Sequence, residues 1–349
     1  MVHAKKHLQA SVEIWLNGDA EAPMMYDTTW KGLINCGCNY NENGTTCTNR
    51  FPSCPALTDT GNNFGNGFYN DHHFHYGYHI YAASVVSMFN HTWAKQFEES
   101  VLMFIRDIAN PSTQDVAFPT FRNKDWFLGS SWASGLCLIG GMPNTNGRDQ
   151  ESSSEAINAG EAVGLFGKVF AEIYSDDEIK YLMYNRMHTI GRIMFTTELR
   201  AAQNFWHILN PAKGVERVYP SAYTPNVVGN LWSLMIDFQT WFGNSPFLCY
   251  GIQLIPLTPS AVYRDDPTWV REMVVPYNES CMTSPGGPSG CVEDGWSIPL
   301  ISSYAAIGEI STAWEMALTL NSSVFLSSGG NGHSLTNLLW YISVRESML

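Results

Sequence analysis

The sequence predicts an all-α protein with long loops, organised as a single domain over residues 1–349. Apolar residues recur at helical spacing in many segments, and the segments between them are rich in Gly, Pro, Asn and Ser. The sequence shows no alternation of short strands, so a parallel βαβ sheet is not expected. Helices in paired hairpins would fill this length, which suits a closed helical toroid whose inner helices line one cleft.

The predicted helices follow one another along the chain. Val2–Leu16 has Leu8, Val12 and Ile14 on a loose apolar stripe. Glu155–Tyr174 has the strongest pattern, because its alanines, valines and phenylalanines share one face. The other predicted helices are Phe74–Phe89, Phe97–Ile108, Asp177–Phe195, Val228–Trp241, Ser302–Leu320 and Leu335–Glu346. No convincing linker separates them, so we expect one domain.

The composition restricts the classes of partner. Charged residues make up 15% of the chain, against about 25% in a typical soluble domain, and the net charge is −13. An acidic chain repels phosphate backbones and anionic membranes, so nucleic acid is not expected as a partner. No apolar run reaches the ~18 residues of a membrane-spanning helix. The aromatic content of 13% fits either core packing or a cleft that stacks on sugar rings.

The eight cysteines suggest an oxidising compartment. Four of them lie within residues 36–54, and Cys281 lies close to Cys291, as in disulfide-closed loops. The alternative for Cys36, Cys38, Cys47 and Cys54 is a zinc knuckle, for which the spacing is irregular. Disulfides are the favoured interpretation. The remaining cysteines are Cys137 and Cys249.

Four glycosylation sequons, at Asn43, Asn90, Asn278 and Asn321, support the same interpretation. Together with the cysteines they predict a secreted glycoprotein, located outside the cell or in a cell wall. The N-terminus lacks the apolar core of a signal peptide. We therefore expect the chain to be a fragment or the product of a truncated gene model.

The first candidate site is the run Asn70-Asp71-His72-His73-Phe74-His75-Tyr76-Gly77-Tyr78. Asp71 directly precedes a predicted helix, so one interpretation is that it only caps the helix. A residue that only caps a helix does not need His and Tyr side chains on the first turns, so these neighbours weaken that interpretation. Asp71, His75 and Tyr78 fall on one side of the helix and can line one wall. The flanking rings can partly desolvate Asp71, as a general acid at neutral pH requires.

The second candidate site is the run Gln150-Glu151-Ser152-Ser153-Ser154-Glu155-Ala156. Glu151 and Glu155 lie four residues apart near a helix N-terminus, where the helix dipole offsets part of their repulsion. Ser152 can cap the helix with Glu155 at its third position, which leaves Glu151 to face a cleft. Two separated carboxylates in aromatic company suit the hydrolysis of a sugar–sugar bond, so a glycosidase is the first hypothesis.

The histidines of the first run allow a further hypothesis, a zinc hydrolase. His73 and His75 are two residues apart and therefore diverge on a helix, and no HExxH pattern is present. We expect no metal and no cofactor. His188, His207 and His333 belong to no motif and are interpreted as surface or core histidines.

Long stretches of the chain resemble glycoside hydrolase family 81, the endo-β-1,3-glucanases. The resemblance rests on the run from Gly65 to Tyr78, on Ser131-Trp132-Ala133-Ser134-Gly135 and on the run from Asp149 to Ala159. Trp241-Phe242-Gly243-Asn244-Ser245-Pro246, the following run to Pro259, and Tyr26-Asp27-Thr28-Thr29-Trp30-Lys31-Gly32-Leu33 add to it. The matches keep the same order over most of the chain.

This resemblance implies an (α/α)6 barrel that hydrolyses β-1,3-glucan, such as laminarin or cell-wall glucan, with inversion. Asp71 would be the general acid, Glu151 the general base, and Glu155 would help to position water or the sugar. Inversion requires the two catalytic carboxyls to lie about 6.5–9.5 Å apart. The candidate sugar-binding residues are His75, Tyr76, Tyr78 and Trp132. We expect a monomer whose partner is the polysaccharide.

The chain also departs from the family. Members carry a β-sandwich domain and a linking domain before the barrel, and we expect both to be absent here. The cysteine-rich 36–54 stretch and the Met142–Arg148 loop look longer than in the family and could reshape the cleft. The alternative function is therefore a catalytically impaired, truncated glucan-binding protein.

Overall fold

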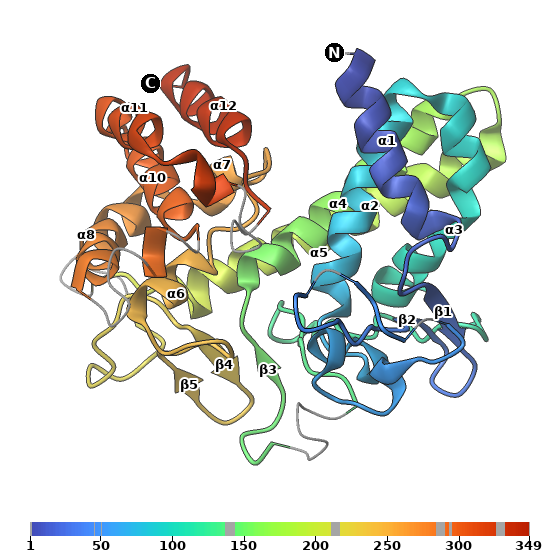
Figure 1. Ribbon diagram of the computed structural model, residues 1–349, viewed down its shortest axis with the longest axis horizontal. Coiled ribbons are helices and arrows are strands. Elements are labelled where there is room, and N and C mark those ends of the chain that lie inside the picture. The colour runs from blue at the N-terminus through green and yellow to red at the C-terminus, as the bar shows by residue number, and fades with distance from the viewer. Residues whose placement is uncertain are drawn as a thin grey trace. The chain divides into compact units, whose positions relative to one another are not determined.

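The computed structural model describes residues 2–44, 46–49, 51–136, 144–210, 217–283, 290–292, 295–325 and 332–348. Its contacts divide the chain into two compact units. Unit 1 comprises Met1–Asp149 and Ala156–Glu198, and unit 2 comprises Gln150–Glu155 and Leu199–Leu349. Helices dominate each unit (Figure 1), which confirms a mostly helical protein. The single domain and the closed toroid stay predictions.

Unit 1 is built on long helices close to those predicted. Their bounds are α1 Val2–Leu16, α2 His72–Phe89, α3 His91–Ala109, α4 Ser153–Ile173 and α5 Glu178–Phe205. α1 matches its prediction at both ends, whereas α5 continues ten residues beyond the predicted end at Phe195. No helix among the described residues is long and apolar enough to cross a membrane.

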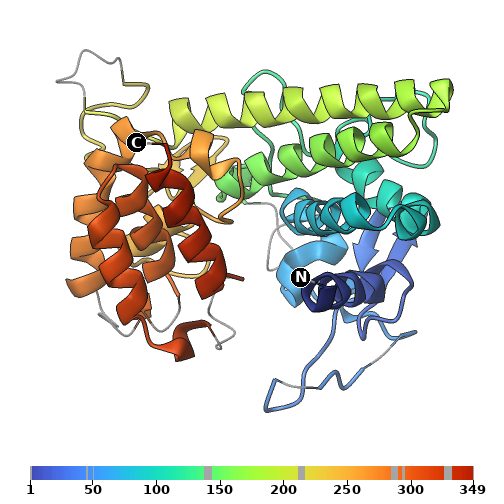
Figure 2. The ribbon, with the colours of Figure 1, turned by 90° about the horizontal axis from the view of Figure 1, so that it is seen from above.

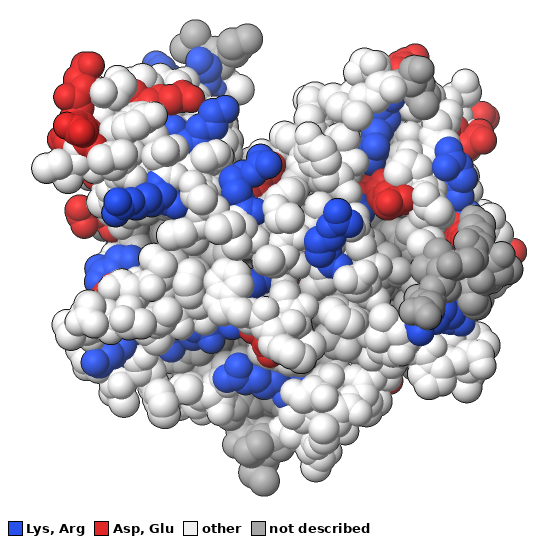
Figure 3. Space-filling view, turned by 180° about the vertical axis from the view of Figure 1, so that it is seen from behind, with Lys and Arg blue, Asp and Glu red and all other residues white. Residues whose placement is uncertain are grey.

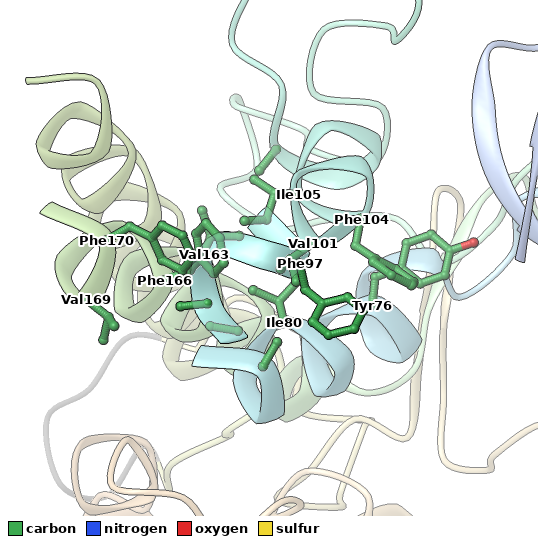
Figure 4. Close-up of a cluster of buried hydrophobic side chains, with 14 of the residues drawn as sticks. Tyr76, Ile80, Phe97, Val101, Phe104, Ile105, Val163, Phe166, Val169 and Phe170 are labelled. Carbon is green, nitrogen blue, oxygen red and sulfur yellow. The ribbon is translucent and has the colours of Figure 1, made fainter. Parts of the chain in front are cut away.

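The core of unit 1 lies where α2, α3 and α4 meet. Asn90 separates α2 from α3, and its Oδ1 accepts a hydrogen bond of 3.1 Å from the backbone N–H of Trp93, which caps α3. Figure 4 shows the apolar side chains that these helices bring together. Its labelled residues are Tyr76, Ile80, Phe97, Val101, Phe104, Ile105, Val163, Phe166, Val169 and Phe170. Their burial is the main stabilisation of this unit.

Glycines allow α4 and α5 to pack closely side by side (Figure 2). A Cβ atom on Gly191 of α5 would lie 2.1 Å from the backbone nitrogen of Gly164 on α4, so no larger residue fits there. Nδ1 of His188 makes a hydrogen bond of 2.7 Å with the carbonyl oxygen of Gly164. His188 is thus explained as a packing residue of this helix pair.

A short antiparallel hairpin precedes α2 in unit 1. Strand β1, Met24–Asp27, pairs with β2, Gly32–Asn35, in a register that places Tyr26 opposite Leu33. Two 3-10 helices follow, η1 at Pro55–Leu57 and η2 at Asn62–Phe68. The sequence did not predict these strands, because each has only four residues and β2 is buried throughout, without alternation.

The disulfide prediction is confirmed. Cys36 pairs with Cys54 and Cys38 with Cys47, which excludes a zinc knuckle built from these four residues. Cys281 pairs with Cys291 in unit 2, as expected. Cys249 is a free, buried thiol. Cys137 and the first two residues of the Met142–Arg148 loop lie outside the described residues.

The segment 228–241 of unit 2 was predicted with the wrong type of secondary structure. Residues 228–241 form a β-hairpin instead of a helix, with β4 at Asn230–Trp232 antiparallel to β5 at Ile236–Asp237. With β3, Asp149–Gln150, they make a sheet of order β3-β4-β5. The Trp232 N–H donates a 2.8 Å hydrogen bond to the Met235 carbonyl across the turn. Short apolar runs fit both helix and strand, and here pairing decided the outcome.

Helices make up most of the other regular secondary structure among the described residues of unit 2. Its helices are α6 Pro246–Gly251, α7 Ala261–Arg264, α8 Pro267–Thr283, α10 Ser297–Ala306, α11 Ile310–Thr319, the 3-10 helix η4 Ser322–Phe325 and α12 Leu335–Glu346. α12 matches its prediction at both ends. The predicted helix Ser302–Leu320 is instead two helices, because Gly308 has a left-handed φ of 90° between α10 and α11. The sequence prediction missed α8, which contains Pro276.

Candidate active site

Asp71 lies directly before α2, in a left-handed backbone conformation with φ 58° and ψ 17°. Its side chain makes no capping hydrogen bond with α2, so the interpretation that Asp71 is only a helix cap is wrong. A left-handed conformation costs a non-glycine residue about 1–2 kcal/mol, although Asp tolerates it better than most. The carboxyl of Asp71 is thus presented from a strained turn.

Asp71 is one of several left-handed residues in this loop. Asn63, Phe64, Gly65 and Tyr69 also have positive φ angles. Backbone strain of this kind persists where surrounding contacts over-determine it, and it concentrates at functional sites. The loop from Asn63 to Asp71 therefore has the backbone character of a functional segment.

The Ser-Trp-Ala-Ser-Gly motif holds the turn at Asp71 from one side. The Asp71 N–H donates to the Ala133 carbonyl at 3.0 Å, and the Gly135 N–H donates to Oδ1 of Asn70 at 2.6 Å. A Cβ atom on Gly135 would lie 2.1 Å from the carbonyl oxygen of Phe68, so only glycine allows this approach. The two sequence motifs are thus parts of one structure.

A buried ionic cluster holds the turn from the other side. His72 makes hydrogen bonds of 2.9 Å through Nδ1 to Oδ2 of Asp107 and through Nε2 to the carbonyl of Asn66. Asp107 also accepts from Nε of Arg122 at 2.9 Å and from the N–H of Leu33 at 3.1 Å. The sequence reasoning missed Asp107 and Arg122. An acidic residue on the apolar face of α3 was the signal that could have indicated Asp107.

His75 and Tyr78 follow Asp71 on α2. The His75 N–H donates to the Asp71 carbonyl at 3.0 Å, which places the two residues one turn apart. Burial, with smaller contributions from the charges of His79 and His72, lowers the pKa of His75 to about 4. Its imidazole is therefore neutral at neutral pH. The Tyr78 side chain is exposed.

Tyr76 and Trp132 are placed differently. Tyr76 is 1% exposed and donates its hydroxyl hydrogen to the Leu33 carbonyl, inside the core of unit 1. Trp132 is 7% exposed, and its indole N–H donates to Oδ2 of Asp125 at 3.2 Å. Both side chains are buried and hydrogen-bonded within unit 1, and their contact with sugar stays a prediction.

Glu151 and Glu155 lie in unit 2, in the segment Gln150–Glu155. Oε1 of Glu151 accepts a hydrogen bond of 2.8 Å from the backbone N–H of Trp241. Nε2 of Gln253 donates to the carbonyl of Glu151, also at 2.8 Å. The main chain and one carboxylate oxygen of Glu151 are thus fixed by two motifs that follow about a hundred residues later in the chain.

Three serines anchor the start of α4. Oγ of Ser152 accepts from the N–H of Glu155 at 3.4 Å, which confirms the predicted cap. Ser153 donates to Oε1 of Gln253 at 2.6 Å, and Ser154 donates to the carbonyl of Ile252 at 2.7 Å. Gln253 is fully buried and was not predicted as a site residue. Its position in the Gly-Ile-Gln run of the third motif was the available signal.

The histidine cluster of α2 does not converge. The ring of His72 faces Asp107, whereas His75 packs edge-on against Phe64 at 5.5 Å between ring centroids. Among the described residues, no group of three His, Cys, Asp or Glu side chains is placed to hold a metal ion. The zinc hypothesis therefore gains no support from this geometry.

Comparison with known proteins gives consistent matches. The glucan endo-1,3-beta-D-glucosidase of Arthroderma benhamiae is 29% identical over 337 residues, which are 96% of this chain and 32% of that protein. Glucan endo-1,3-beta-D-glucosidase 2 of Saccharomyces cerevisiae is 30% identical over 274 residues, 76% of this chain and 30% of that protein. The glucan endo-1,3-beta-D-glucosidase of Glycine max is 26% identical over 98% of this chain and 45% of its own length.

A solved structure supports the same relationship. A mutant glycoside hydrolase family 81 protein from Clostridium thermocellum superposes with a TM-score of 0.71 and 25% identity, covering 97% of this chain and 40% of that one. The chain therefore spans less than half the length of these relatives. Residues 1–342 match the C-terminal domain of glycosyl hydrolase family 81. The chain belongs to glycosyl hydrolase family 81.

Proposed function

We propose that this chain is the catalytic domain of an inverting endo-1,3-β-glucanase. Asp71 protonates the glycosidic oxygen, Glu151 removes a proton from the attacking water, and Glu155 positions the water or the sugar. The observation that carries these roles is the strained turn at Asp71, which presents a carboxyl that is not used as a helix cap. The named activity of the relatives supports the substrate class.

The reaction breaks the bond between the anomeric carbon and the bridging oxygen. Protonation by Asp71 makes that oxygen a neutral leaving group, while water deprotonated by Glu151 attacks from the opposite face of the sugar ring. The configuration at the anomeric carbon inverts. This requires the Asp71 and Glu151 carboxyls to lie about 6.5–9.5 Å apart in the working enzyme, which leaves room for the water.

The substrate is a neutral polysaccharide, β-1,3-glucan of the laminarin or cell-wall type. On the face that Figure 3 shows, charged side chains are scattered over a mostly uncharged surface, which suits such a partner. Exposed Tyr78 and neutral His75, on the same side of α2 as Asp71, are the proposed sugar contacts. The chemistry needs no cofactor.

The disulfides support a site of action outside the cell or in a cell wall, where oxidised thiols persist. Three disulfides close local loops among the described residues. We propose that the domain acts there as a monomer.

The test is proton NMR of laminarin digestion by the wild type and by Glu151→Gln, following the anomeric proton of the first product. Early α-anomer from the wild type, with none from the variant, is the expected result. Early β-anomer would mean retention and would overturn the assigned roles. Absence of any product, with glucan still bound, would contradict catalysis and favour a glucan-binding protein.

A further inference from the structure

The ring of His72 has hydrogen-bond acceptors on both sides. Nδ1 lies 2.9 Å from a carboxylate oxygen of Asp107, and Nε2 lies 2.9 Å from the carbonyl oxygen of Asn66. The two contacts tie the His72 ring to Asp107 on one side and to the main chain at Asn66 on the other.

The His72 ring belongs to a buried cluster centred on the Asp107 carboxylate. The side chains of His72 and Asp107 are 0% exposed, and that of Arg122 is 12% exposed. The Asp107 carboxylate thus bridges the His72 ring and the Arg122 guanidinium, and the N–H of Leu33 is its third partner. Removing one member of such a buried cluster leaves an uncompensated charge or polar group. The rings of Tyr69 and Tyr76 pack on His72, at 4.8 and 4.6 Å between centroids.

This cluster spans the turn that presents Asp71. His72 follows Asp71 directly, and its ring bonds back to Asn66 across the left-handed loop. Through Asp107, the same ring ties the loop to α3. Displacing the His72 ring would release the C-terminal side of the turn from both anchors.

The N-terminal side of the turn is held by the same arginine. The Arg122 guanidinium stacks on the ring of Tyr69 at 4.2 Å, and the Tyr69 hydroxyl donates to Oδ2 of Asp27 at 2.8 Å. A Cβ atom on Gly32 would lie 2.3 Å from Cε1 of Tyr69 and 2.6 Å from Nη2 of Arg122. This contact explains the glycine of the Trp-Lys-Gly run. Both ends of the turn therefore converge on Arg122.

We propose that His72 and Asp107 are positioning residues, which fix the left-handed turn so that Asp71 meets the glycosidic oxygen. This inference rests on the proposed function of Asp71. His72 and Asp107 are inside the protein and do not touch the sugar. Their effect is on the proton donation by Asp71, and not on the attack of water.

The test separates proton donation from the rest of catalysis. Laminarin needs a general acid, whereas a β-laminaritriosyl fluoride needs much less, because fluoride leaves with little protonation. In His72→Asn, the side-chain amide can still donate a hydrogen bond to Asp107. In His72→Gln, it can still donate a hydrogen bond to the carbonyl of Asn66. In His72→Asn, His72→Gln and Asp107→Asn we expect kcat on laminarin to fall about 100-fold, with kcat on the fluoride nearly unchanged and KM nearly unchanged.

Glu98→Gln is the matched control. Glu98 is a buried acid on the same helix, α3, and accepts hydrogen bonds from Tyr174, Tyr184 and Lys180, away from the turn. The Glu98→Gln substitution should lower the melting temperature without changing the ratio of kcat on laminarin to kcat on the fluoride. If the His72 and Asp107 variants fail to fold, Tyr69→Phe, which deletes only the hydroxyl contact to Asp27, replaces them and should give the same selective loss.

The outcomes are distinct. Equal losses on both substrates in the folded variants, or no loss on laminarin, would overturn the positioning role. The proposed function is tested in the same series by the wild type and Asp71→Asn. If the wild type does not cleave laminarin, or if Asp71→Asn cleaves it normally, the assigned function fails first and for a separate reason.

Discussion

The backbone N–H of Trp241 donates a hydrogen bond of 2.8 Å to Oε1 of Glu151, which joins two motifs 90 residues apart in the sequence. The contact fixes one oxygen of the proposed general base. Because the donor is a main-chain group, the side chain of Trp241 is not needed for it.

This contact can be removed with a matched control. Trp241→Pro lacks the N–H, whereas Trp241→Ala keeps it and loses only the indole. A hydrogen bond to a charged group contributes about 1.5–3 kcal/mol, so we expect kcat on laminarin to be at least ~10-fold lower in the proline variant than in the alanine variant. Steady-state kinetics with both proteins measures this. Equal kcat values would show that the contact has no catalytic consequence.

Asp71→Asn keeps the size of the side chain and removes its acid. We expect hydrolysis of laminarin to fall about 10²- to 10⁴-fold, the usual contribution of a general acid, with an unchanged circular dichroism spectrum. Asn tolerates the left-handed backbone as well as Asp does, so folding should be preserved. Asp59→Asn, at an exposed position in the same unit, is the control and should retain activity. Near-wild-type turnover by the Asp71 variant would sink the assignment.

The close contact of α4 and α5 predicts a strong asymmetry between two glycines. Gly191→Ala places a methyl group 2.1 Å from the backbone of Gly164, and should lower the free energy of unfolding by about 1–3 kcal/mol. In Gly164→Ala, on the facing helix, the added methyl group lies 3.5 Å from its nearest neighbour. The change in the free energy of unfolding should therefore be near zero or slightly stabilising, since Ala favours helix. Urea unfolding compares the two. A similar loss in both variants would contradict the packing.

Two buried histidines in unit 2 should make the protein sensitive to mild acid. Burial, with a smaller effect of Arg264, lowers the pKa of His207 to about 3, and burial lowers the pKa of His333 to about 4. Between these values and the unfolded value of about 6.5, only the unfolded chain binds the protons. Stability is therefore full above pH ~6.5 and falls with pH, by up to about 1.4 kcal/mol per unit for each histidine.

The measurement is urea unfolding between pH 7.5 and 4.5 for the wild type and for His207→Gln. His207 stacks on Trp269 at 3.7 Å, so the variant should be less stable at pH 7.5. Its dependence on pH should nevertheless be shallower, because one protonation is removed. An unchanged slope would mean that His207 does not titrate on unfolding.

The sequence predicted the long amphipathic helices best. α1 and α12 match at both ends, since a sustained apolar stripe specifies a helix without help from distant residues. The helix prediction for residues 228–241 was wrong because a short apolar run is equally compatible with a hairpin, and only pairing with other residues decides between them. Gly308 shows the opposite case, in which one local residue divided a predicted helix.

The site shows the same division. Asp71, Glu151 and Glu155 were predicted from their motifs, because acid–base chemistry restricts the residue types, and their roles stay predictions. The residues that hold them, such as Asp107 and Gln253, were missed. They act through contacts 35 and 102 residues away along the chain, which no local pattern reveals. That Asp71 and Glu151 act together as general acid and general base stays a prediction.

The left-handed backbone at position 71 limits which acidic residue can occupy that position. Aspartate and asparagine accept this conformation because their short polar side chains interact with the local main chain, whereas longer side chains such as glutamate gain no such compensation. The main chain thus selects the length of the carboxylic acid before any sugar is bound. An attempt to move the proposed proton donor outward by lengthening this side chain would have to rebuild the turn as well.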